Sequence, residues 1–381
     1  MLDFDTTNIN LGLERVSAVL ISLGNPHLKF PAIHVAGTNG KGSVCSMTAS
    51  ILKEAGYKVG LFTSPQLFKW NERIKVNGVD ISDEDFERLE TTTVGTRLIA
   101  SQRTPFEVIT CMAFQYFAEQ KIDIAVVEVG MGGRLDATNV VNPIITVITN
   151  IDFDHMQYLG RTIKDIAYEK SGIIKEGIPL VTAEKKKDAL TVMQKTAEEC
   201  GKLRNVPILN VELLNIPRSL LIPHFIGSNV LFQQTNVAVV LKVADLLREQ
   251  GYKISDENIR AGLLNTRWPG RFQIISEEPL IIVDGAHNPA GAKVLKEFIL
   301  SLKVKEKFTL VFGSQEDKDD KTMLENLSEI TDSVIMAKSF HPKAKQASNS
   351  VKEAIETAKK RKKPILITGS LFIAAEALAQ F

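Results

Sequence analysis

The chain has 381 residues, of which 44% are hydrophobic and 24% are charged, and its 46 Lys and Arg residues against 45 Asp and Glu residues leave a formal net charge of +1. This composition is typical of a folded protein and excludes a disordered chain, while the balanced charge gives no general attraction to nucleic acid or to anionic lipid. The length exceeds what one hydrophobic core usually organises, so we expect about two or three domains, with two as the first choice.

The first part of the chain alternates short apolar runs with helical patterns. The apolar runs predict strands at residues 32–36, 59–63, 124–129 and 144–149. Apolar residues at helical spacing predict helices at 41–55, from about 83 to 120, and at about 163–174. Ser82 is the predicted cap of the second helical stretch, with Asp85 three positions later. Such alternation favours a mostly parallel sheet with helices on both faces. The stretch of about 201–227 has weak periodicity and predicts no definite element.

Pro269 and Gly270 interrupt this pattern with a turn, and we place a domain boundary between residues 268 and 269. Beyond it, apolar runs predict strands at 280–284, 308–313, 333–337 and 364–368, each followed by a helical pattern. The predicted class is therefore α/β, with a larger domain over residues 1–268 and a smaller, Rossmann-like α/β domain over residues 269–381.

The first predicted strand leads into a glycine-rich loop and then into a helix. The loop consists of Gly37, Thr38, Asn39, Gly40, Lys41, Gly42 and Ser43. Backbone N–H groups at a helix N-terminus bind anions, glycines let the backbone approach closely, and Lys41 adds a positive charge for the outer phosphates of a nucleotide. The generic phosphate-loop pattern is not matched, because its first glycine would fall at Val35 and its hydroxyl residue at Gly42. A glycine-rich turn without a ligand remains the alternative.

Polar residues that could bind a metal ion follow three predicted strands. Ser64, Glu128 and His155 lie at or just after strand ends, where ligands collect in open α/β sheets, so we expect them near Lys41. Hydroxyl and carboxylate oxygens suit Mg²⁺, whereas a lone histidine is more often structural. Lys170 lies on a predicted helix, and its position alone indicates a solvated surface lysine.

The three cysteines, Cys45, Cys111 and Cys200, lie far apart and form no CxxC pair. This spacing predicts neither a disulfide framework nor a zinc site and favours a reducing compartment. The N-terminus has no basic leader before an apolar run, and no later segment is as long as a membrane span. We therefore expect a cytoplasmic protein without a membrane or nucleic-acid partner, and a monomer.

Several longer segments resemble one family in the same order along nearly the whole chain. The loop GTNGKGS resembles the ATP loop of the Mur-ligase superfamily. The other segments resemble folylpolyglutamate synthase and dihydrofolate synthase. They are TSPQL with NERIKVNG (63–78), VVEVGMGGRLDATN (126–139), TNIDFDHMQYLG (149–160), EKSGIIK (169–175), WPGRF (268–272), VDGAHNP (283–289) and TGSLF (368–372). The resemblance implies a Mur-ligase-type ATPase domain followed by a Rossmann-like domain that binds glutamate.

The resemblance also implies the cofactors. These are ATP and two Mg²⁺ ions, with Ser64, Glu128 and His155 as metal ligands and the last two on the second ion. Lys170 is implied to carry a carbamate formed with CO₂, which turns a cation into a carboxylate-like anion that ligates metal or orients phosphate. Lys41, Glu128, His155 and Lys170 then form the implied catalytic set.

Nucleotide and glutamate contacts come from the same resemblance. Asn236, Arg271 and Asp284 match the family's adenine, phosphate and ribose contacts, respectively. His287, Asn288 and Ser370 are candidates to receive the incoming glutamate. Read without the family, Asn236 could equally cap or pack within a helix. Asp284 ends an apolar strand, where a carboxylate is costly unless it is paired.

The implied reaction is ATP-dependent ligation of L-glutamate to a folate-type carboxylate through an acyl phosphate, with release of ADP and phosphate. Tetrahydrofolate is one expected acceptor and dihydropteroate a second. Gln66 stands where many relatives have histidine, which leaves the acceptor open. The alternatives are a glutamate ligase for another pterin-like cofactor, a peptidoglycan-precursor ligase, and an inactive nucleotide-binding regulator.

Overall fold

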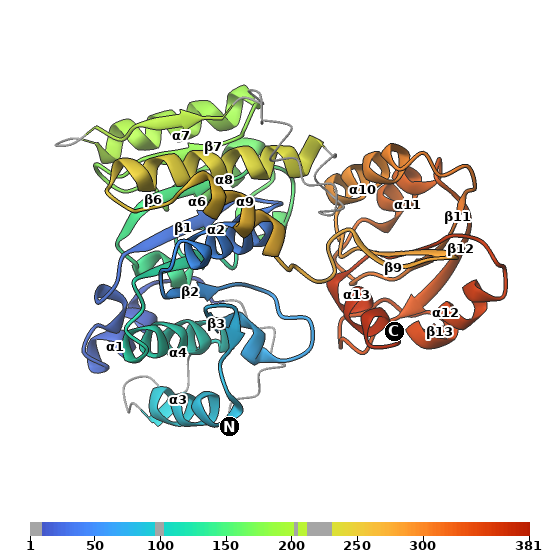
Figure 1. The fold of residues 1–381 in the computed structure, drawn as a ribbon, viewed down its shortest axis with the longest axis horizontal. Helices are drawn as coiled ribbons and strands as arrows, with labels where there is room; N and C mark the ends of the chain where they lie inside the picture. The colour runs from blue at the N-terminus through green and yellow to red at the C-terminus, as the bar shows by residue number, and fades with distance from the viewer. Residues whose placement is uncertain (1–9, 96–102, 202–204, 212–230) are drawn as a thin grey trace. The chain divides into compact units, whose positions relative to one another are not determined.

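The computed structural model describes residues 10–95, 103–201, 205–211 and 231–381 (Figure 1). The chain divides into two compact units, Met1–Ile216 with Thr235–Thr266, and Pro217–Gln234 with Arg267–Phe381. Each unit is built on its own sheet, and the predicted α/β class is confirmed. Most of the stretch 201–227, for which no element is predicted, lies outside the described residues.

The first unit contains an eight-stranded sheet in the order β4-β3-β2-β5-β1-β6-β7-β8. Its strands are β1 (Ala32–Ala36), β2 (Val59–Phe62), β3 (Ile74–Val76), β4 (Val79–Asp80), β5 (Ile124–Glu128), β6 (Pro143–Ile148), β7 (Leu180–Thr182) and β8 (Ile208–Asn210). All pairs from β2 to β8 along this order are parallel, and β3 and β4 form an antiparallel hairpin beside β2. The central strands β1 and β5 are buried throughout, as the continuous apolar runs predict.

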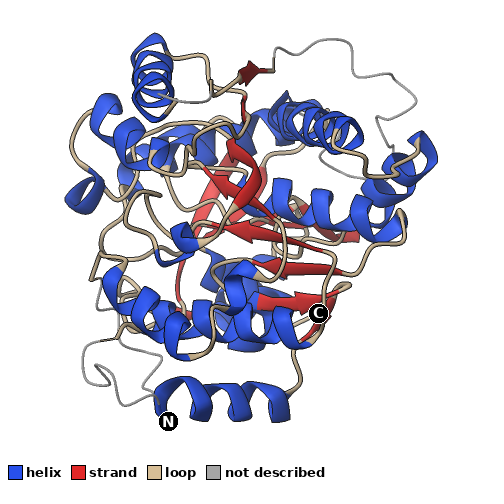
Figure 2. Cartoon of the chain, turned by 90° about the vertical axis from the view of Figure 1, so that its left-hand side faces the viewer, coloured by secondary structure: helices blue, strands red, loops and turns tan. Residues whose placement is uncertain are grey.

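Helices cover the sheet of the first unit on both sides (Figure 2). They are α1 (Glu14–Ser22), α2 (Lys41–Glu54), α3 (Asp83–Gly95), α4 (Pro105–Glu119), α5 (Met156–Leu159), α6 (Ile163–Ser171), α7 (Lys187–Cys200), α8 (Leu231–Glu249) and α9 (Asp256–Asn265), with short 3₁₀ turns η1 (Pro26–Leu28), η2 (Trp70–Arg73) and η3 (Ala137–Val140). The helices α1 and α4 share one core with β5, whereas α6 and α7 share another with β6.

The helix α2, which starts in the glycine loop, is backed closely by α9. A Cβ atom at Gly262 would lie 2.5 Å from the Cα of Ile51, so only glycine permits this approach. Ser50 Oγ donates to the carbonyl of Gly262 at 2.7 Å. Asn258 Nδ2 donates to the carbonyl of Glu54 at 2.8 Å, which satisfies a carbonyl at the end of α2. The contact therefore fixes the helix that carries the loop.

The second unit contains a six-stranded sheet in the order β13-β12-β11-β14-β10-β9. Its elements are β9 (Gln273–Glu277), β10 (Leu280–Val283), α10 (Pro289–Ser301), β11 (Phe308–Phe312), α11 (Asp320–Leu327), β12 (Thr331–Lys338), β13 (Asn349–Ser350), α12 (Val351–Lys359), β14 (Ile365–Thr368) and α13 (Leu371–Leu378). The helices α10 and α11 pack on one face, and α12 and α13 pack on the other (Figure 1).

The strands predicted from apolar runs are all present, as β1, β2, β5 and β6 in the first unit and β10, β11, β12 and β14 in the second. The sequence pattern misses the hairpin β3–β4, the short strands β7, β8 and β13, and the antiparallel strand β9. These strands are short or only half-buried, so they contain no long continuous apolar run. Within the described ranges, no helix has the length and apolar character needed to cross a bilayer.

A buried charge pair holds the start of α4. Glu107 is 3% exposed, and its Oε2 accepts from the backbone N–H of Thr104 at 2.7 Å. Its Oε1 accepts from Arg15 Nε at 2.9 Å. Removing one partner of such a pair leaves a buried charge without its counter-ion, which is strongly destabilising, unlike the loss of an exposed pair.

We therefore predict that Glu107→Ala lowers the free energy of unfolding by about 3 kcal/mol. Glu119→Ala removes the carboxylate that pairs with exposed Arg88 at 2.8 Å and should cost less than about 1 kcal/mol. Urea unfolding followed by circular dichroism measures both. Equal losses in the two variants would contradict a structural role for the buried pair.

Candidate functional site

The glycine loop at residues 37–43 follows β1 and leads into α2, as predicted. Gly37 has φ 140° and Gly40 has φ 85°, both in the region that favours glycine. The end of β6 clamps the loop, because Thr149 Oγ1 donates to the carbonyl of Asn39 at 2.7 Å and Asn39 N donates to Asn150 Oδ1 at 2.9 Å. The loop is thus held from outside by the neighbouring strand end.

Lys170, on α6, is not the surface lysine that its position indicates. It is 4% exposed, and its Nζ donates to the carbonyl of Gly37 at 3.0 Å. Burial, together with the charge of Lys41, lowers the pKa of Lys170 to about 7, although Asp154 and Asp136 act in the opposite direction. Much of this amine is therefore neutral near pH 7. The surface interpretation was wrong because α6 turns this residue onto the glycine loop.

Glu128 ends β5 and lies beside Ser64, which follows the neighbouring strand β2. Glu128 is 3% exposed, and its Oε2 accepts from the backbone N–H of Ser64 at 3.0 Å. The charges of both Glu128 and Lys41 influence the pKa of Cys45, which burial raises well above its ordinary value. Glu128 therefore lies near the first turn of α2, and Cys45 is a buried packing residue of that turn.

His155 does not directly follow a strand, so that part of the prediction was wrong. β6 ends at Ile148, and His155 is the N-cap of α5 with φ 48° and ψ 37°. The chain between them first closes over the glycine loop, where Asp152 N donates to Thr38 Oγ1 at 2.9 Å. The Nε2 of His155 lies 3.8 Å from Asp154 Oδ2. The imidazole is thus placed by a loop and not by the strand itself.

The donors of the first unit suit a hard cation. The carboxylate of Glu128 and the hydroxyl of Ser64 are oxygen donors of the kind that Mg²⁺ takes together with phosphate oxygens and water. Within the described ranges, no three His, Cys, Asp or Glu side chains gather as a metal-binding cluster. A magnesium ion here would therefore depend on oxygen atoms from beyond these residue types, such as those of a nucleotide.

Sequence reasoning missed a buried hydrogen-bonded chain behind the site. Asp136 is 4% exposed, and it accepts from Thr138 Oγ1 at 2.5 Å and from Met131 N at 2.8 Å. Because the hydroxyl of Thr138 donates to Asp136, His34 Nε2, 2.9 Å away, must donate to that hydroxyl. Burial lowers the pKa of His34 to about 3, so the ring stays neutral. These hydrogen bonds connect the loop after Glu128 to strand β1. The alternation of apolar and polar residues in the sequence does not reveal them.

In the second unit, the buried carboxylate of Asp284 has the partners that its burial requires. It accepts from Phe272 N at 2.9 Å and from Ala286 N at 2.8 Å. Burial raises the pKa of Asp284, while Arg271 and these two hydrogen bonds lower it. Arg271 and Asp284 are therefore close together. Asn236 is 2% exposed on α8 and belongs to the first unit.

The three candidate glutamate contacts lie at two neighbouring strand ends. Asn288 follows β10, and its Oδ1 accepts from Gly291 N at 2.7 Å as the N-cap of α10. Ser370 follows β14 and caps α13 through Ile373 N at 3.1 Å. His287 Nδ1 lies 3.0 Å from the carbonyl of Gly285. Two of the three side chains thus stabilise helix ends, and a substrate role for them stays a prediction.

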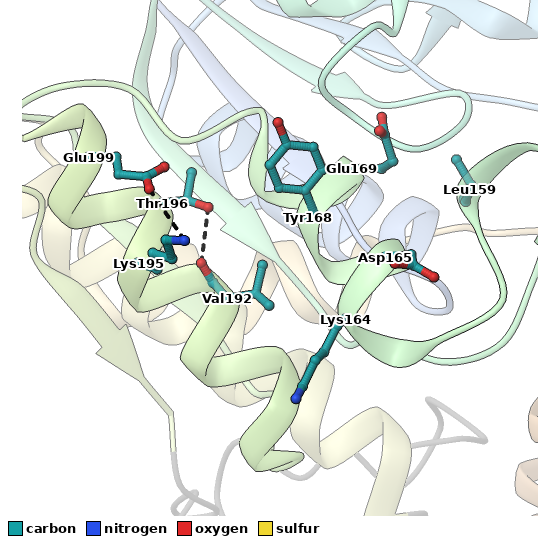
Figure 3. A pocket seen from close by; sticks show the side chains of 9 residues that line it. All are labelled: Leu159, Lys164, Asp165, Tyr168, Glu169, Val192, Lys195, Thr196 and Glu199. Carbon is teal, nitrogen blue, oxygen red and sulfur yellow. Dashed lines mark hydrogen bonds and ion pairs between the residues drawn. The ribbon is translucent and has the colours of Figure 1, made fainter.

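A separate cavity of about 580 Å³ lies between α6 and α7. Its walls come from Leu159, Lys164, Asp165, Tyr168, Glu169, Val192, Lys195, Thr196 and Glu199 (Figure 3). The charged groups have local partners, such as Lys195 with Glu199 at 3.7 Å and Glu169 with Arg134 at 2.7 Å. None of the predicted site residues lines this cavity.

Known proteins resemble the chain over both units. Residues 35–203 match the Mur ligase middle domain, and residues 270–379 match the family described as Mur ligase, glutamate ligase domain. The chain is 38% identical to a dihydrofolate synthase/folylpolyglutamate synthase of Bacillus subtilis, over 96% of this chain and 94% of that protein.

Two solved structures share its fold. E. coli FolC in complex with DHPP and ADP superposes with a TM-score of 0.86 at 30% identity, covering 99% of this chain and 95% of FolC. An FPGS complex with AMPPCP and folate has a TM-score of 0.84 at 30% identity, covering 99% of this chain and 97% of that one.

The contact between the glycine loop and β6 predicts the effect of one added methyl group. A Cβ atom at Gly37 would lie 1.9 Å from Thr149 Oγ1, and the φ of Gly37 is strained for other residues. Gly37→Ala should therefore weaken binding of a non-hydrolysable ATP analogue by at least about tenfold. In Gly95→Ala, the matched control, the new Cβ meets nothing within 4 Å. Titration calorimetry measures both, and equal affinities would contradict the assignment of the loop.

Proposed function

The chain belongs to the folylpolyglutamate synthase and dihydrofolate synthase family of Mur ligases, and on this premise we propose that it joins L-glutamate to a folate-type acid with conversion of ATP to ADP and phosphate. The observation that carries the proposal is the closure of separate segments around the glycine loop. Lys170 contacts Gly37 at 3.0 Å, and Glu128 contacts Ser64 at 3.0 Å. These residues lie in the unit that matches the Mur ligase middle domain.

The reaction has two steps. A carboxylate oxygen of the acceptor attacks the γ-phosphorus of ATP, the bond from that phosphorus to the bridging oxygen breaks, and ADP leaves. The amino group of glutamate then attacks the acyl carbon, the C–O bond to phosphate breaks, and the amine loses a proton. Positioning and charge neutralisation dominate such phosphoryl transfers. The glycine loop residues Gly37–Ser43 would bind the phosphates, and Lys41 would neutralise their charge.

Magnesium is the metal that fits the donors of this unit. Ser64 and Glu128 would hold one ion, which would neutralise the charge that develops on the phosphates. The buried position of Glu128, fixed by the Ser64 N–H at 3.0 Å, supports this role. A second ion on Glu128 and His155 is part of the proposal.

We assign a carbamate to Lys170. The neutral amine attacks CO₂, an N–C bond forms, and one proton leaves, which yields an anionic carbamate. Burial and the charge of Lys41 lower the pKa of Lys170 to about 7, so the reactive neutral amine is available at physiological pH. An anion beside Lys41 would relieve the repulsion between the two cations and supply oxygen atoms to the metal.

The remaining residue roles are part of the same proposal. Arg271 would bind phosphate and Asp284 ribose, while Asn236 of the first unit would contact adenine. His287, Asn288 and Ser370 would receive glutamate, and the adjacency of their strand ends supports this, since Gly369 N donates to Ala286 O at 3.1 Å. An enzyme that consumes ATP and has three free thiols suits the cytoplasm, and we expect it to act as a monomer.

The function test is ADP release with tetrahydrofolate or dihydropteroate, each with and without L-glutamate. We expect release that requires both an acceptor and glutamate, with coupled formation of the glutamylated product seen by mass spectrometry. Use of dihydropteroate alone or of tetrahydrofolate alone would define which of the family's two activities is present. Release that is independent of every folate-type acceptor and of glutamate would contradict the proposal.

The carbamate proposal predicts the behaviour of Lys170→Ala. Turnover should fall by at least about 100-fold, because an anion at the phosphates is lost, while the melting temperature stays near that of the wild type. Lys164→Ala is the matched control, since this exposed lysine of the same helix pairs with Asp188 at the surface, at 3.5 Å. Full activity of Lys170→Ala would rule out the role.

The pH dependence follows from the direction of the shift. Because the pKa of Lys170 is about 7, the amine is neutral above that pH and protonated below it. After removal of CO₂, the same concentration of dissolved CO₂ should therefore restore activity faster at about pH 8 than at about pH 6. Labelling with ¹³CO₂ should give a carbamate resonance in the wild type that is missing in Lys170→Ala.

A further inference from the structure

A buried guanidinium lies next to the proposed metal site, and the reaction described so far does not use it. Arg73 ends η2 and is 8% exposed. Its carbonyl accepts from Thr63 N at 3.1 Å, so it lies beside the strand end that leads into Ser64. Burial lowers the pKa of Arg73 to about 9, and the nearby charge of Glu128 opposes this shift. The group is therefore a cation at neutral pH.

Three neighbouring side chains fix the orientation of this guanidinium. Its Nε donates to Gln66 Oε1 at 2.7 Å, and its Cζ lies 4.1 Å from the ring centroid of Trp70 and 6.0 Å from that of Phe106. The Phe106 ring is itself held, because a Cβ atom at Gly130 would lie 2.4 Å from its Cζ. Cation–π contact and one hydrogen bond thus hold the group in one orientation.

The two Nη atoms of Arg73 have no hydrogen-bond acceptor among the described residues, which indicates that an anionic ligand binds them. Across the described ranges, the one side-chain hydrogen bond of Arg73 is the Nε bond to Gln66, and no carboxylate lies within ion-pair distance of it. A buried cation without a counter-ion destabilises the folded state. Such a cation is expected where an anionic ligand binds and supplies the opposite charge. The remaining fork of N–H donors matches the two oxygens of a carboxylate.

We propose that Arg73 binds the reacting carboxylate of the acceptor acid, a step that rests on the proposed function. The nucleotide phosphates have their own cradle at Gly37–Ser43 after β1, whereas Arg73 lies at the β2 side next to Ser64 and Glu128. One acceptor oxygen would stay on the guanidinium while the other attacks phosphorus. The held oxygen becomes the carbonyl oxygen of the acyl phosphate, and Arg73 then stabilises the negative charge that forms there when the amine attacks.

Gln66 acquires a role in this arrangement. Its side-chain oxygen touches the Nε of Arg73 and leaves the Nη fork for the substrate. Gln66 is therefore a positioning residue. Its neutral amide orients the guanidinium without adding a charge that would repel it. Trp70 supports the opposite face of the group.

The test uses Arg73→Lys and Arg73→Gln in the full chain. The lysine keeps the charge but loses the fork, and Arg88→Gln is the matched control at an exposed site of the same unit. We expect the KM for the acceptor to rise about 10- to 100-fold in both Arg73 variants, with the KM for ATP changed less than about threefold. Equilibrium binding of the acceptor, in the presence of a non-hydrolysable ATP analogue, should weaken by the same factor.

A comparison of two acceptors distinguishes binding of the reacting carboxylate from binding of another carboxylate. Dihydropteroate carries one carboxylate, which is the reacting one, whereas tetrahydrofolate carries an additional one. Loss of affinity for both supports the proposal. Loss confined to tetrahydrofolate, a rise confined to the KM for glutamate, or unchanged acceptor binding would each overturn it.

Gln66→Leu provides a second variant that leaves Arg73 in place. It should raise the acceptor KM by about three- to tenfold at an unchanged melting temperature, because the Nε loses its acceptor. If both Arg73 variants fail to fold, an unchanged acceptor KM in Gln66→Leu overturns the proposal. A wild-type enzyme without acceptor-dependent ADP release contradicts the proposed function instead, so the two failures are distinguishable.

Discussion

The hydrogen bond from Lys170 Nζ to the carbonyl of Gly37 is the contact on which the shape of the glycine loop depends. A loop with three glycines has little side-chain packing of its own, and its backbone would otherwise sample many conformations. Lys170 holds one end, and Thr149 and Asn150 hold the middle. The loop therefore keeps an anion-binding shape before any nucleotide arrives, and the cost of ordering it is met on folding and not on binding.

Buried polar side chains in both units also form hydrogen bonds with loop backbone. The buried carboxylates of Asp136 and Asp284 accept from backbone N–H groups that a turn would otherwise leave unsatisfied, those of Met131 and Phe272 respectively. Arg73 differs from these carboxylates, because its Nη atoms have no hydrogen-bond partner among the described residues. This difference supports a substrate role for its guanidinium.

Apolar runs made most of the fold predictable, and the glycine loop with its ordered companion segments made the family predictable. What the pattern could not supply is which way a single side chain turns. Lys170 reads as a surface lysine on a helical wheel but faces the loop, because the helix is packed there by residues distant in sequence. The sequence predicts that His155 lies at a strand end, but the chain first passes over Thr38.

The sequence predicts that Asn288 and Ser370 contact the substrate. The structure shows in addition that they are the N-caps of α10 and α13, and these caps can be recognised only once the first residue of each helix is known. The sequence segment NERIKVNG does not indicate that Arg73 is buried, because burial without an ion pair produces no recognisable residue pattern.

The close approach of α9 to α2 has a consequence for how this protein is made. Ser50 bonds to Gly262, 212 positions later in the chain. Contacts of such sequence separation form late, since the intervening chain must first be brought together. During synthesis, the helix that follows the glycine loop therefore emerges from the ribosome long before its supporting partner exists. The nascent chain carries an incompletely packed nucleotide domain until the residues of α9 appear, which makes this interval the one in which chaperones have most reason to bind.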